Sequence, residues 1–558
     1  MVDSQQLANT RIFSGSDSSE ELRKQYFDSG WLVSIPLSII PAHWINRGEK
    51  RLDGGFYSQE AVAAQRVIND SGFRSEDLQQ LVSDLFILGR FKRIYATDKE
   101  SGWQYLSASE ALDFRPVSER WIARYYAPKE AERHFVKQGW LIISSSGTVG
   151  RLAIVTKRLE KFFLTHDLIR IIPSEKLPIG YLYAFLSTWI GQALIVKDQY
   201  GSSIKHLEPH HIADLPIPLI ANDLQNGIHE AITKAFILRD EANTLLDKAD
   251  ELLHRELGLP SFDESIVPYL TTPKDKIQLE LPHPKAFSIR ASELDERFDG
   301  SYHVPVVRTA LKFLEQGKYR TERLETIASD IVVAPRFKRI YVPKEYGIPL
   351  LQGSHLSQTR PQDLKFISRT QQRNLENWII RKGWVLVTCS GTIGRVGLVS
   401  SYQNEWAASQ HILRVVPDYA KGLPGYIAAF LMTPYGQHQI LAKIYGGVVD
   451  EISAEDVGQI LIPNAPMPVQ EKVSDLVISA FEKKDEASEL EESAIKYLES
   501  ILLGRDDMSK NNTVSDSFER FRELTASLIA VPKSKIIEAE KNNKQQKQKK
   551  INRKKKSS

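Results

Sequence analysis

The chain has 558 residues, enough for several domains, since one domain usually holds about 100 to 200 residues. With 42% apolar and 26% charged residues, its composition is ordinary for a soluble globular protein. The net charge is +3, but residues 533–558 hold eleven Lys or Arg against two Glu, a net +9. The preceding chain therefore carries −6, which excludes a uniformly basic body and restricts any basic surface to a local patch.

Cys389 is the only cysteine, which excludes an internal disulfide and is consistent with a cytoplasmic protein. The N-terminus lacks the succession of basic, apolar and small residues found in a signal peptide. The most membrane-like stretch is 179–196, but its counterpart from Gly425 contains Pro434 and Gln437, which a lipid-facing helix tolerates poorly. We expect both stretches to be helices buried in domains, and no membrane contact.

No structure is assigned to residues 1–50, but from Arg51 onward the sequence is duplicated. The matching segments are 51–57 with 297–302, 90–95 with 336–341, 146–151 with 390–395, and Arg170 and Pro173 with Arg414 and Pro417. Their offsets are 246, 246, 244 and 244 residues. Because the order is kept with a drift of only two residues, the sequence predicts two copies of one domain.

Each copy combines strands and helices. Residues 140–155 and 384–399 are apolar runs interrupted by Ser-Gly-Thr, a pattern typical of strand, tight turn, strand. Residues 168–173 and 412–417 are short strands that end at proline. The apolar stretch 179–196 and its counterpart are predicted helices, so the fold class is α+β.

A long helix is predicted after each copy. Apolar residues separated by three and four positions form a coiled-coil seam in each helix. The seam residues are Ala235, Leu238, Ala242, Leu245, Ala249 and Leu252, matched 245 residues later by Ala480, Lys483, Ala487, Leu490, Ala494 and Tyr497. We predict that the helices pair as an antiparallel coiled coil that separates the two similar domains. The alternative is two unrelated amphipathic helices, each lying on its own domain.

The predicted boundaries follow from these elements. They are 1–50 for the unassigned segment, 51–221 for the first domain, 222–258 for the first long helix, 259–290 for a proline-rich connector, 291–465 for the second domain, 466–505 for the second long helix, and 506–558 for a polar helical stretch and a disordered lysine-rich tail.

The hexamer Arg-Phe-Lys-Arg-Ile-Tyr occurs unchanged in both copies. It supplies the candidate DNA contacts Arg90, Lys92, Arg93 and Tyr95, and Arg336, Lys338, Arg339 and Tyr341. Read as a strand, it places Arg90, Lys92 and Ile94 on one face, and Phe91, Arg93 and Tyr95 on the other. Cations beside aromatics can neutralise phosphates and reach guanine. The alternative is a solvated strand edge protected by charge.

Two further features add candidates. The Ser-Gly-Thr turns end in Arg151 and Arg395 and offer backbone N–H groups, but lack the lysine and spacing of a phosphate-binding loop. A purely structural turn explains them as well. Tyr-Gly loops at 200–205 and 445–448 differ between the copies, and the first contributes the candidates Ser202, Ser203 and Lys205. Such divergence suits two domains that read different sequences, although neutral drift explains it equally.

Catalytic and metal motifs are missing from the sequence. The pair His210-His211 is replaced by Glu455-Asp456 in the second copy, and neither a cysteine nor a third histidine stands at ligand spacing. There is no Gly-x-Ser-x-Gly elbow, dinucleotide fingerprint, or Asn/Asp-Pro-Pro-aromatic tetrapeptide of amino-methylating enzymes. We therefore expect a binding protein with no catalytic residues and no metal.

The order domain, long helix, domain, long helix, with a proline-rich strand and a Gln before each helix, resembles the specificity subunit of type I restriction-modification systems. The resemblance covers residues 51–504. It rests on the motifs at 139–150 and 383–394, the hexamers, the Tyr-Gly loops, and the segments Pro218–Gln225 and Pro463–Gln470 that lead into the helices.

The resemblance implies a non-catalytic subunit whose two target-recognition domains each read one half of a bipartite site in double-stranded DNA. The coiled coil would set the spacing, and modification subunits that bind S-adenosylmethionine and methylate adenine would dock around it. A restriction subunit would use ATP and magnesium, and no cofactor is expected on this chain. The competing hypothesis is a two-domain adaptor that binds protein segments, not DNA.

Overall fold

The computed structural model describes residues 40, 56–96, 99–118, 120–201, 203–262, 267, 277–278, 287–294, 297–336, 338–361, 363–447 and 449–504. The predicted N-terminal segment, apart from Ile40, and the predicted tail lie outside the described residues. So do Ser202 and most of the predicted connector.

The first domain is built from short strands and helices. In chain order they are α3 (Gln59–Asp70), β1 (Ser75–Asp77), α4 (Leu78–Leu81), β2 (Val82–Phe86), β3 (Tyr95–Ala96), β4 (Gly102–Leu106), α5 (Ala108–Ala111), β5 (Trp121–Ala123), η2 (Arg124–Tyr126), η3 (Ala131–His134), β6 (Leu141–Ser144), β7 (Leu152–Ile154), η4 (Leu159–Lys161), β8 (Phe163–Leu164), β9 (Leu168–Pro173), α6 (Ile179–Ser187), α7 (Trp189–Val196), α8 (Pro209–Ala213) and β10 (Pro216–Pro218). Helix α9 (Asn222–Leu257) follows.

The second domain repeats this series. The connecting region contributes β11 (Ile277–Gln278). The second domain then contains, in chain order, η6 (Ala291–Glu293), α10 (Pro305–Gln316), β12 (Thr321–Arg323), α11 (Leu324–Ile327), β13 (Ala328–Val333), β14 (Tyr341–Val342), η7 (Lys344–Tyr346), β15 (Gly347–Leu351), η8 (Gly353–Leu356), β16 (Lys365–Ser368), η9 (Leu375–Trp378), β17 (Val385–Thr388), β18 (Val396–Leu398), β19 (Ala407–Ala408), β20 (Ile412–Pro417), α12 (Pro424–Met432), α13 (Pro434–Ala442), α14 (Ala454–Gly458) and β21 (Leu461–Pro463). Helix α15 (Met467–Leu502) follows.

The sheets of the two domains correspond strand for strand. The order β2-β9-β6-β7 in the first domain matches β13-β20-β17-β18 in the second, and β3-β5-β4-β8 matches β14-β16-β15-β19. Among the described strands, β11 alone has no counterpart; it pairs with β3, so this part of the connector lies on the first domain. The antiparallel pairs β6-β7 and β17-β18 flank the Ser-Gly-Thr turns. The structure thus confirms the predicted strand, turn, strand units and the duplicated α+β domains.

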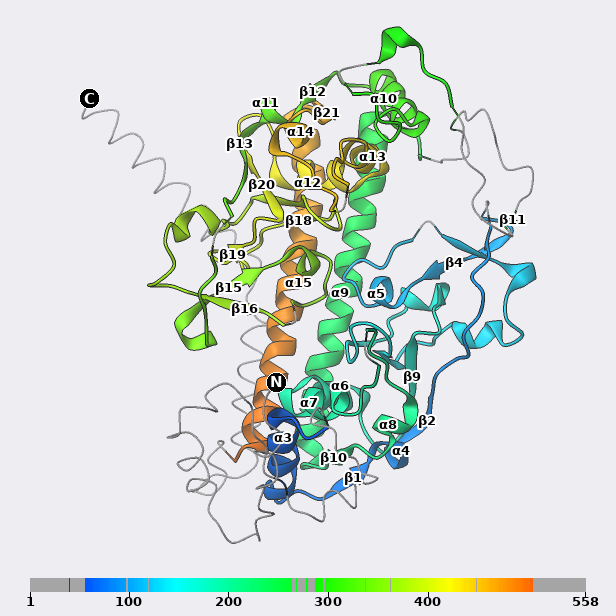
Figure 1. Cartoon of the computed structure of the whole chain (residues 1–558), viewed down its shortest axis with the longest axis vertical. Helices are drawn as coiled ribbons and strands as arrows, with labels where there is room; N and C mark the ends of the chain where they lie inside the picture. Colours follow the sequence, from blue (N-terminus) through cyan, green and yellow to red (C-terminus); the bar gives the residue numbers. More distant parts are fainter. Residues whose placement is uncertain are drawn as a thin grey trace, which may run out of the picture.

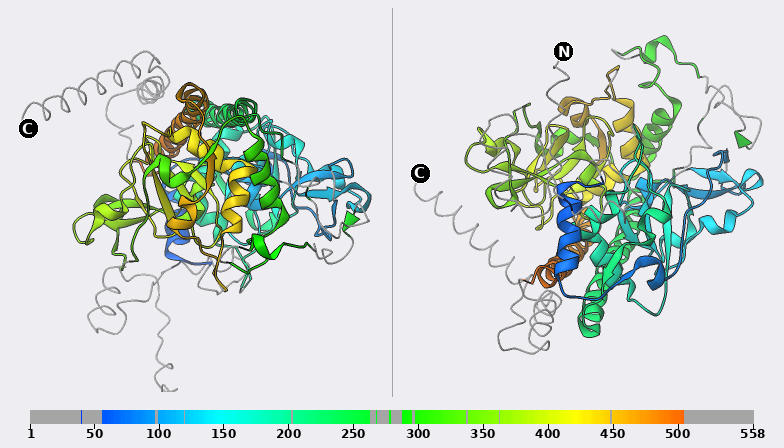
Figure 2. Two further views of the ribbon diagram at one scale, coloured as in Figure 1. Left: turned by 90° about the horizontal axis from the view of Figure 1, so that it is seen from above. Right: turned by 60° about the horizontal axis from the view of Figure 1, so that its bottom comes forward.

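Helices α9 and α15 run side by side along the length of the molecule (Figure 1). Each has 36 residues, about 54 Å at 1.5 Å per residue. Figure 2 shows the same pair from two other directions, with the domains flanking it. Helix α9 ends at Gly258, whose φ of +66° lies in the left-handed region that suits glycine as a helix terminator.

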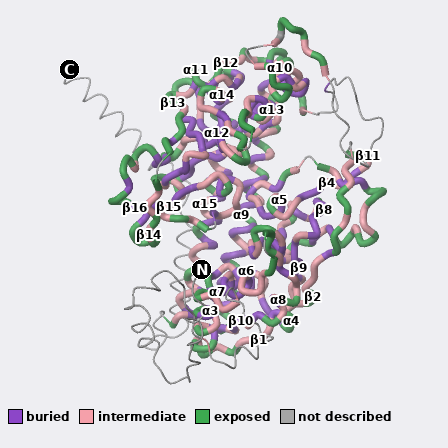
Figure 3. The backbone as a smooth tube through the Cα atoms, in the orientation of Figure 1, coloured by how far each residue is buried: buried purple, intermediate pink, exposed green. Residues whose placement is uncertain are grey.

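The two helices are antiparallel, as predicted. Ile228 near the start of α9 shares a hydrophobic cluster with Leu498 near the end of α15. Leu253 near the end of α9 shares a second cluster with Val477 near the start of α15. Figure 3 shows buried residues along both helices and within both domains. Each domain therefore builds its core on the N-terminal half of its own helix and the C-terminal half of the other.

The structure places the predicted seam residues in two groups. Fully buried are Ala235, Leu238, Ala242, Ala249, Ala480, Ala487, Leu490 and Ala494. Leu245, Leu252, Lys483 and Tyr497 are only half-buried, and their following neighbours Leu246, Leu253, Lys484 and Leu498 are buried instead. The buried series 235, 239, 242, 246, 249 and 253, and 480, 484, 487, 491, 494 and 498, keep spacings of four and three, so the seam lies one residue later at every second predicted position.

A charged group interrupts the apolar contact between the helices. The Glu491 carboxylate, with its side chain 1% exposed, accepts hydrogen bonds from the Tyr183 hydroxyl at 2.9 Å and Arg360 Nε at 3.0 Å, and pairs with Arg239. Burial raises the pKa of Glu491, but the two guanidinium groups hold it at about 2. Because Tyr183 belongs to α6 and Arg360 to the second domain, this Glu491 node joins both helices and both domains.

The structure corrects two sequence-based predictions. The hexamers are not strands: residues 90–94 have irregular backbone, and only Tyr95 and Tyr341 begin strands, β3 and β14. The stretch 179–196 is not one helix, since α6 and α7 are bent by 78° at a break. Thr188 causes the break, because its hydroxyl accepts from Gly191 N–H and donates to the Phe185 carbonyl.

Candidate nucleic-acid interface

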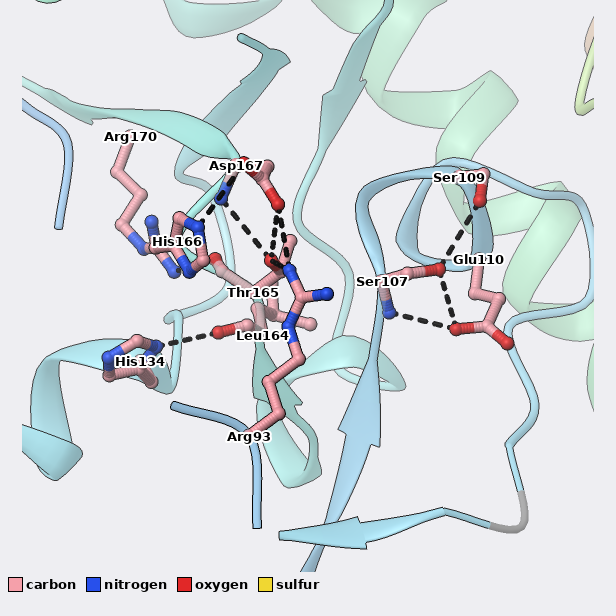
Figure 4. A network of polar contacts seen from close by, with 10 residues as sticks. All are labelled: Arg93, Ser107, Ser109, Glu110, His134, Leu164, Thr165, His166, Asp167 and Arg170. Atoms are coloured by element: carbon pink, nitrogen blue, oxygen red, sulfur yellow. Dashed lines mark hydrogen bonds and ion pairs between the residues drawn. The ribbon is translucent and has the colours of Figure 1, made fainter. Parts of the chain in front are cut away.

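In the first domain, the hexamer, the Ser-Gly-Thr turn and the Tyr-Gly loop come together. Gly147 N–H of the turn donates to the Lys205 carbonyl of the loop at 3.0 Å, and Ser145 N–H donates to the Asp167 carbonyl at 3.1 Å. Figure 4 shows Arg93 of the hexamer reaching the Asp167 carboxylate, with Nη2 to Oδ2 at 3.0 Å. Asp167 therefore connects the hexamer to the turn, and the turn connects to the loop.

The second domain repeats this arrangement with different side chains. Gly391 N–H donates to the Asp450 carbonyl at 3.1 Å, and Cys389 N–H donates to the His411 carbonyl at 3.0 Å. Arg339 Nη2 donates to Gln410 Oε1 at 2.7 Å instead of meeting a carboxylate. The backbone frame of the candidate interface is thus the same in both copies, while the groups that the arginine meets are not.

The turn is held from inside each domain. The Ser144 hydroxyl donates to the Thr148 carbonyl at 2.6 Å, which closes the turn, and Gln192 of α7 donates to the Gly150 carbonyl at 3.1 Å. Gly150 has a φ of +87°, a conformation that other residues rarely adopt. The second copy repeats these features with Thr388, Thr392, Gly394 and Gln437. The turn is therefore rigid and presents its outer side in a fixed position.

An inward-facing phenylalanine anchors the irregular hexamer. The ring of Phe91 lies 4.9 Å from that of His134 and 5.7 Å from that of Phe163, measured between ring centroids. Arg90 and Lys92 are consequently exposed on the outer side. This packing explains why the hexamer leaves the strand conformation: the aromatic anchor, rather than strand alternation, decides which side chains face the solvent.

The other candidate residues of the hexamers differ in exposure. Tyr95 is half-buried, whereas Tyr341 is 46% exposed and has the Lys365 ammonium 5.4 Å from its ring centroid. Arg336 is exposed, lies 3.4 Å from Glu451, and is accompanied by the exposed Lys338. Both domains therefore present cations from the same segment.

The candidate residues on the turns and loops also differ in exposure and in their contacts. Ser203 and Lys205 are exposed on the first Tyr-Gly loop. Arg151 is largely buried and has an internal role, because it donates to the Leu112 carbonyl at 3.1 Å and lies 3.7 Å from Asp113. Arg395, its counterpart, lines a pocket. The two arginines of the repeated turns are therefore not equivalent.

His166 and His411, to which the sequence assigned no shared role, lie among the charged residues of these segments. Burial and the nearby Arg93 and Arg90 lower the pKa of His166, while Asp167 opposes them. Burial, Arg339 and Arg336 lower the pKa of His411, and Glu451 opposes them. The sequence signal was available, since 166–167 and 410–411 are matching dipeptides with different charges.

Buried arginines brace both frames from behind. Arg170 is fully buried and donates to the carbonyls of Leu168 at 2.8 Å and Thr165 at 2.9 Å. Arg414 does the same to Ile412 at 2.6 Å and to Ala408. Burial lowers the pKa of each to about 10. These two matched residues therefore position the segment that carries Asp167 or His411.

The domains also meet each other across the helix pair. Phe114 N–H donates to the Ser357 carbonyl at 2.7 Å, and Asn243 of α9 donates to the Phe114 carbonyl at 2.7 Å. The ammonium of the buried Lys484 lies 4.5 Å from the Phe114 ring centroid. Beside this contact lies a cleft of about 830 Å³, lined by residues of both domains and both helices.

Within the described ranges, no group of three or more His, Cys, Asp or Glu is arranged to hold a metal ion. No single helix of the described chain is long and apolar enough to cross a membrane. Helices α6 and α7 together meet the length and composition criteria, but as a bent pair whose residues are mostly buried.

No family model matches the chain, and no curated protein sequence matches it. Among solved structures, the S subunit of a type I restriction-modification system from M. genitalium is 12% identical, covers 77% of this chain and 95% of its own, and has a TM-score of 0.29. The HsdS subunit from Thermoanaerobacter tengcongensis is 14% identical, with 78% and 97% covered and a TM-score of 0.24. A third structure, concerning complex assembly and conformational transition of the type I R-M system, is 14% identical, with 78% and 98% covered and a TM-score of 0.24. All three matches belong to the type I restriction-modification systems that the sequence resembles.

Proposed function

We propose that the chain is the DNA-specificity subunit of a type I restriction-modification complex, and that each domain reads one half of a bipartite site. The observation that carries this proposal is the placement of two matched sets of exposed cations on two copies of one domain. Arg90 and Lys92 in the first copy correspond to Arg336 and Lys338 in the second. Cations at two repeated positions suit contact with phosphates at two sites along one duplex.

The helix pair supplies the second requirement of a bipartite reader, a constant separation. Helices α9 and α15 share buried seams with both domains, and the Glu491 node ties all four parts. If the two domains are held at a fixed separation, both can bind DNA together only where the half-sites have the matching spacing. The same frame with different side chains in the two copies suits half-sites of different sequence.

In this proposal the chain performs no chemistry. Modification subunits that bind S-adenosylmethionine methylate adenine, and a restriction subunit that uses ATP and magnesium translocates and cleaves the DNA. The exposed outer faces of α9 and α15 would receive the modification subunits. The cytoplasm is the expected location, because the chain acts on cellular and invading DNA.

The test is to purify the chain with candidate modification subunits from the same source and to map N6-methyladenine in cells with and without it. A bipartite methylated motif that vanishes on deletion of the chain is the expected result. Substituting Arg90 and Lys92 by Ala should make methylation less dependent on the sequence of one half-site only. Substituting Arg336 and Lys338 by Ala should make methylation less dependent on the sequence of the other half-site.

Unchanged methylation, with no modification subunit co-purifying, would overturn the proposal. The twin domains would then be tested as an adaptor for protein segments. A methylated motif in which both half-sites respond equally to substitutions in one domain would also contradict it, because the domains would not read separately.

A further inference from the structure

The smaller sheet of each domain carries a very exposed tyrosine. These sheets, β3-β5-β4-β8 and β14-β16-β15-β19, project from the helix pair in opposite directions, with β4 on the right of Figure 1 and β15 and β16 on the left; the first view of Figure 2 shows the same. Tyr125 is 84% exposed and Tyr346 is 70% exposed. They are the two most exposed tyrosines of the described chain, and the proposed function has so far given them no role.

One arginine marks the same corner in both sheets. In the first domain, Arg124 Nε donates to the Gly102 carbonyl, where β4 begins, at 3.1 Å. In the second domain, Arg369 Nε donates to the Gly347 carbonyl, where β15 begins, also at 3.1 Å. Arg124 and Arg369 are therefore equivalent, and we call them the corner arginines. Both are exposed.

The two exposed tyrosines lie at this corner but come from different segments. Tyr125 directly follows the corner arginine of the first copy, and the residue in that position of the second copy is Thr370. Tyr346 lies on the neighbouring segment, where its carbonyl accepts the N–H of the second corner arginine at 3.4 Å. The matching carbonyl of the first copy belongs to Ser101 and accepts the N–H of the first corner arginine at 3.0 Å. Both copies thus place a tyrosine at the corner, on either side of the same hydrogen bond.

The corner also adjoins the hexamer that supplies the proposed phosphate contacts. The residue before each corner arginine donates its N–H to the carbonyl of the fifth hexamer residue, Ile94 in the first copy and Ile340 in the second, at 2.9 Å in both. The exposed Lys92 and Lys338 stand two positions earlier in the hexamers. Each exposed ring is therefore accompanied by cations from two segments, the hexamer and the corner.

The fold does not explain these two rings. A side chain that is 84% or 70% exposed buries little apolar surface, so it contributes little to the stability of the domain. An aromatic ring beside cations suits nucleic acid, because the cations hold the phosphates while the apolar ring can contact a thymine methyl group or the edge of a base pair. Phosphate contacts position a protein on DNA, and base contacts make the binding specific.

We propose that the rings of Tyr125 and Tyr346 contact base pairs, each in the half-site of its own domain, and help to determine which sequence that domain reads. This inference rests on the proposed function and adds two specificity-determining residues to it. Because the two tyrosines come from different segments, their rings meet the DNA from different sides of the corner. The domains can therefore read different base pairs although they share one frame.

The test uses the full-length chain purified with its modification subunits. Binding is measured by fluorescence anisotropy on the duplex with the mapped site and on duplexes with one changed base pair at each position. Tyr125→Ala should bind the mapped site about fivefold or more weakly than the wild type. Tyr125→Phe, which keeps the ring, should stay close to the wild type. Tyr419→Ala is the control for position, because Tyr419 is 56% exposed but lies between β20 and α12, and it should bind as the wild type does.

Two further readouts separate a base contact from a phosphate contact. Tyr125→Ala should lose discrimination at one or two base pairs of the first domain's half-site and keep it in the other half-site, and Tyr346→Ala should do the reverse. Neither substitution should change the salt slope, because the ring carries no charge, whereas the loss of a phosphate-binding cation reduces that slope by about one unit.

Several results would overturn the inference. They are unchanged affinity in both Ala variants, a loss that is equal for every duplex, or a loss in Tyr125→Phe as large as in Tyr125→Ala. If the Ala variants instead lose the modification subunits, the rings belong to a protein interface and the assignment to DNA is wrong. Failure of the wild type itself to bind a methylated motif would overturn the proposed function, and this is seen before any variant is compared.

Discussion

Replacing Glu491 by Gln tests whether one carboxylate holds the helices and domains together. The substitution keeps the size of the side chain but leaves the guanidinium groups of Arg239 and Arg360 without their buried counter-charge. Removing one partner from a buried ion pair typically costs about 3–5 kcal/mol. The two guanidinium groups also hold the pKa of Glu491 well below its ordinary value, so the folded state favours the carboxylate that the substitution removes.

The assay is urea unfolding of the full-length chain, with tryptophan fluorescence as the measured signal. Lys483→Ala is the control, because Lys483 forms an ion pair with Glu241 across the same two helices. Both side chains of this pair are about a third or more exposed, and an exposed ion pair contributes about 0–1 kcal/mol. Equal losses in Glu491→Gln and Lys483→Ala would refute the reasoning.

The same residue makes a pH prediction whose sign follows from linkage. The pKa of Glu491 is lower in the folded state than in the unfolded state, so its contribution is fully present above about pH 4.5 and is lost as the pH falls from 4.5 toward 2. The stability difference between wild type and Glu491→Gln should therefore shrink across this window. A difference that stays constant would contradict the charge-based explanation.

Three further predictions address the rest of the molecule. Inserting two helical turns, about 10.8 Å, into both α9 and α15 should lengthen the preferred spacing by about three base pairs and leave the half-sites unchanged, as read by methylation mapping. Gly180→Ala should cost about 1–3 kcal/mol in urea unfolding, because its Cβ would lie 2.7 Å from the His229 carbonyl oxygen. Gly89→Ala, with open space around it, should cost little. Arg90→Ala and Arg336→Ala should each reduce the salt slope of DNA binding by about one unit, and an unchanged slope would remove that residue from the interface.

The domain plan could be predicted from the sequence because it depends on repetition. Identical hexamers and Ser-Gly-Thr turns at nearly constant offsets show duplication without any knowledge of contacts. The helix pair could be predicted because small and apolar residues recur with the period of a helix face. The break between α6 and α7 was less visible in the first copy, but the second copy contains Thr433-Pro434, an N-cap followed by the proline favoured at a helix start.

The candidate interface was only partly predictable, for a physical reason. The charge and exposure of Arg90 and Lys92 could be predicted from the hexamer itself. Its backbone conformation could not, because it depends on the packing of Phe91 against the rings of His134 and Phe163, which come later in the chain. Likewise, Arg151 and Arg395 are the same residue in the same turn, but Arg151 donates to the Leu112 carbonyl and lies 3.7 Å from Asp113. Such partners belong to tertiary structure, which periodicity does not encode.

The duplication separates what the fold requires from what each domain does. Contacts that support the frame are kept: Tyr181 and Tyr426 both donate to the proline carbonyl before the long helix, and Arg170 and Arg414 both brace the strand behind the interface. Charged groups around that frame are exchanged in both directions. Asp167 and Glu110 of the first copy are replaced by His411 and His355, whereas Lys205 and His206 of the first Tyr-Gly loop are replaced by Asp450 and Glu451. One frame therefore carries different charges in its two copies, as the proposed reading of two different half-sites requires.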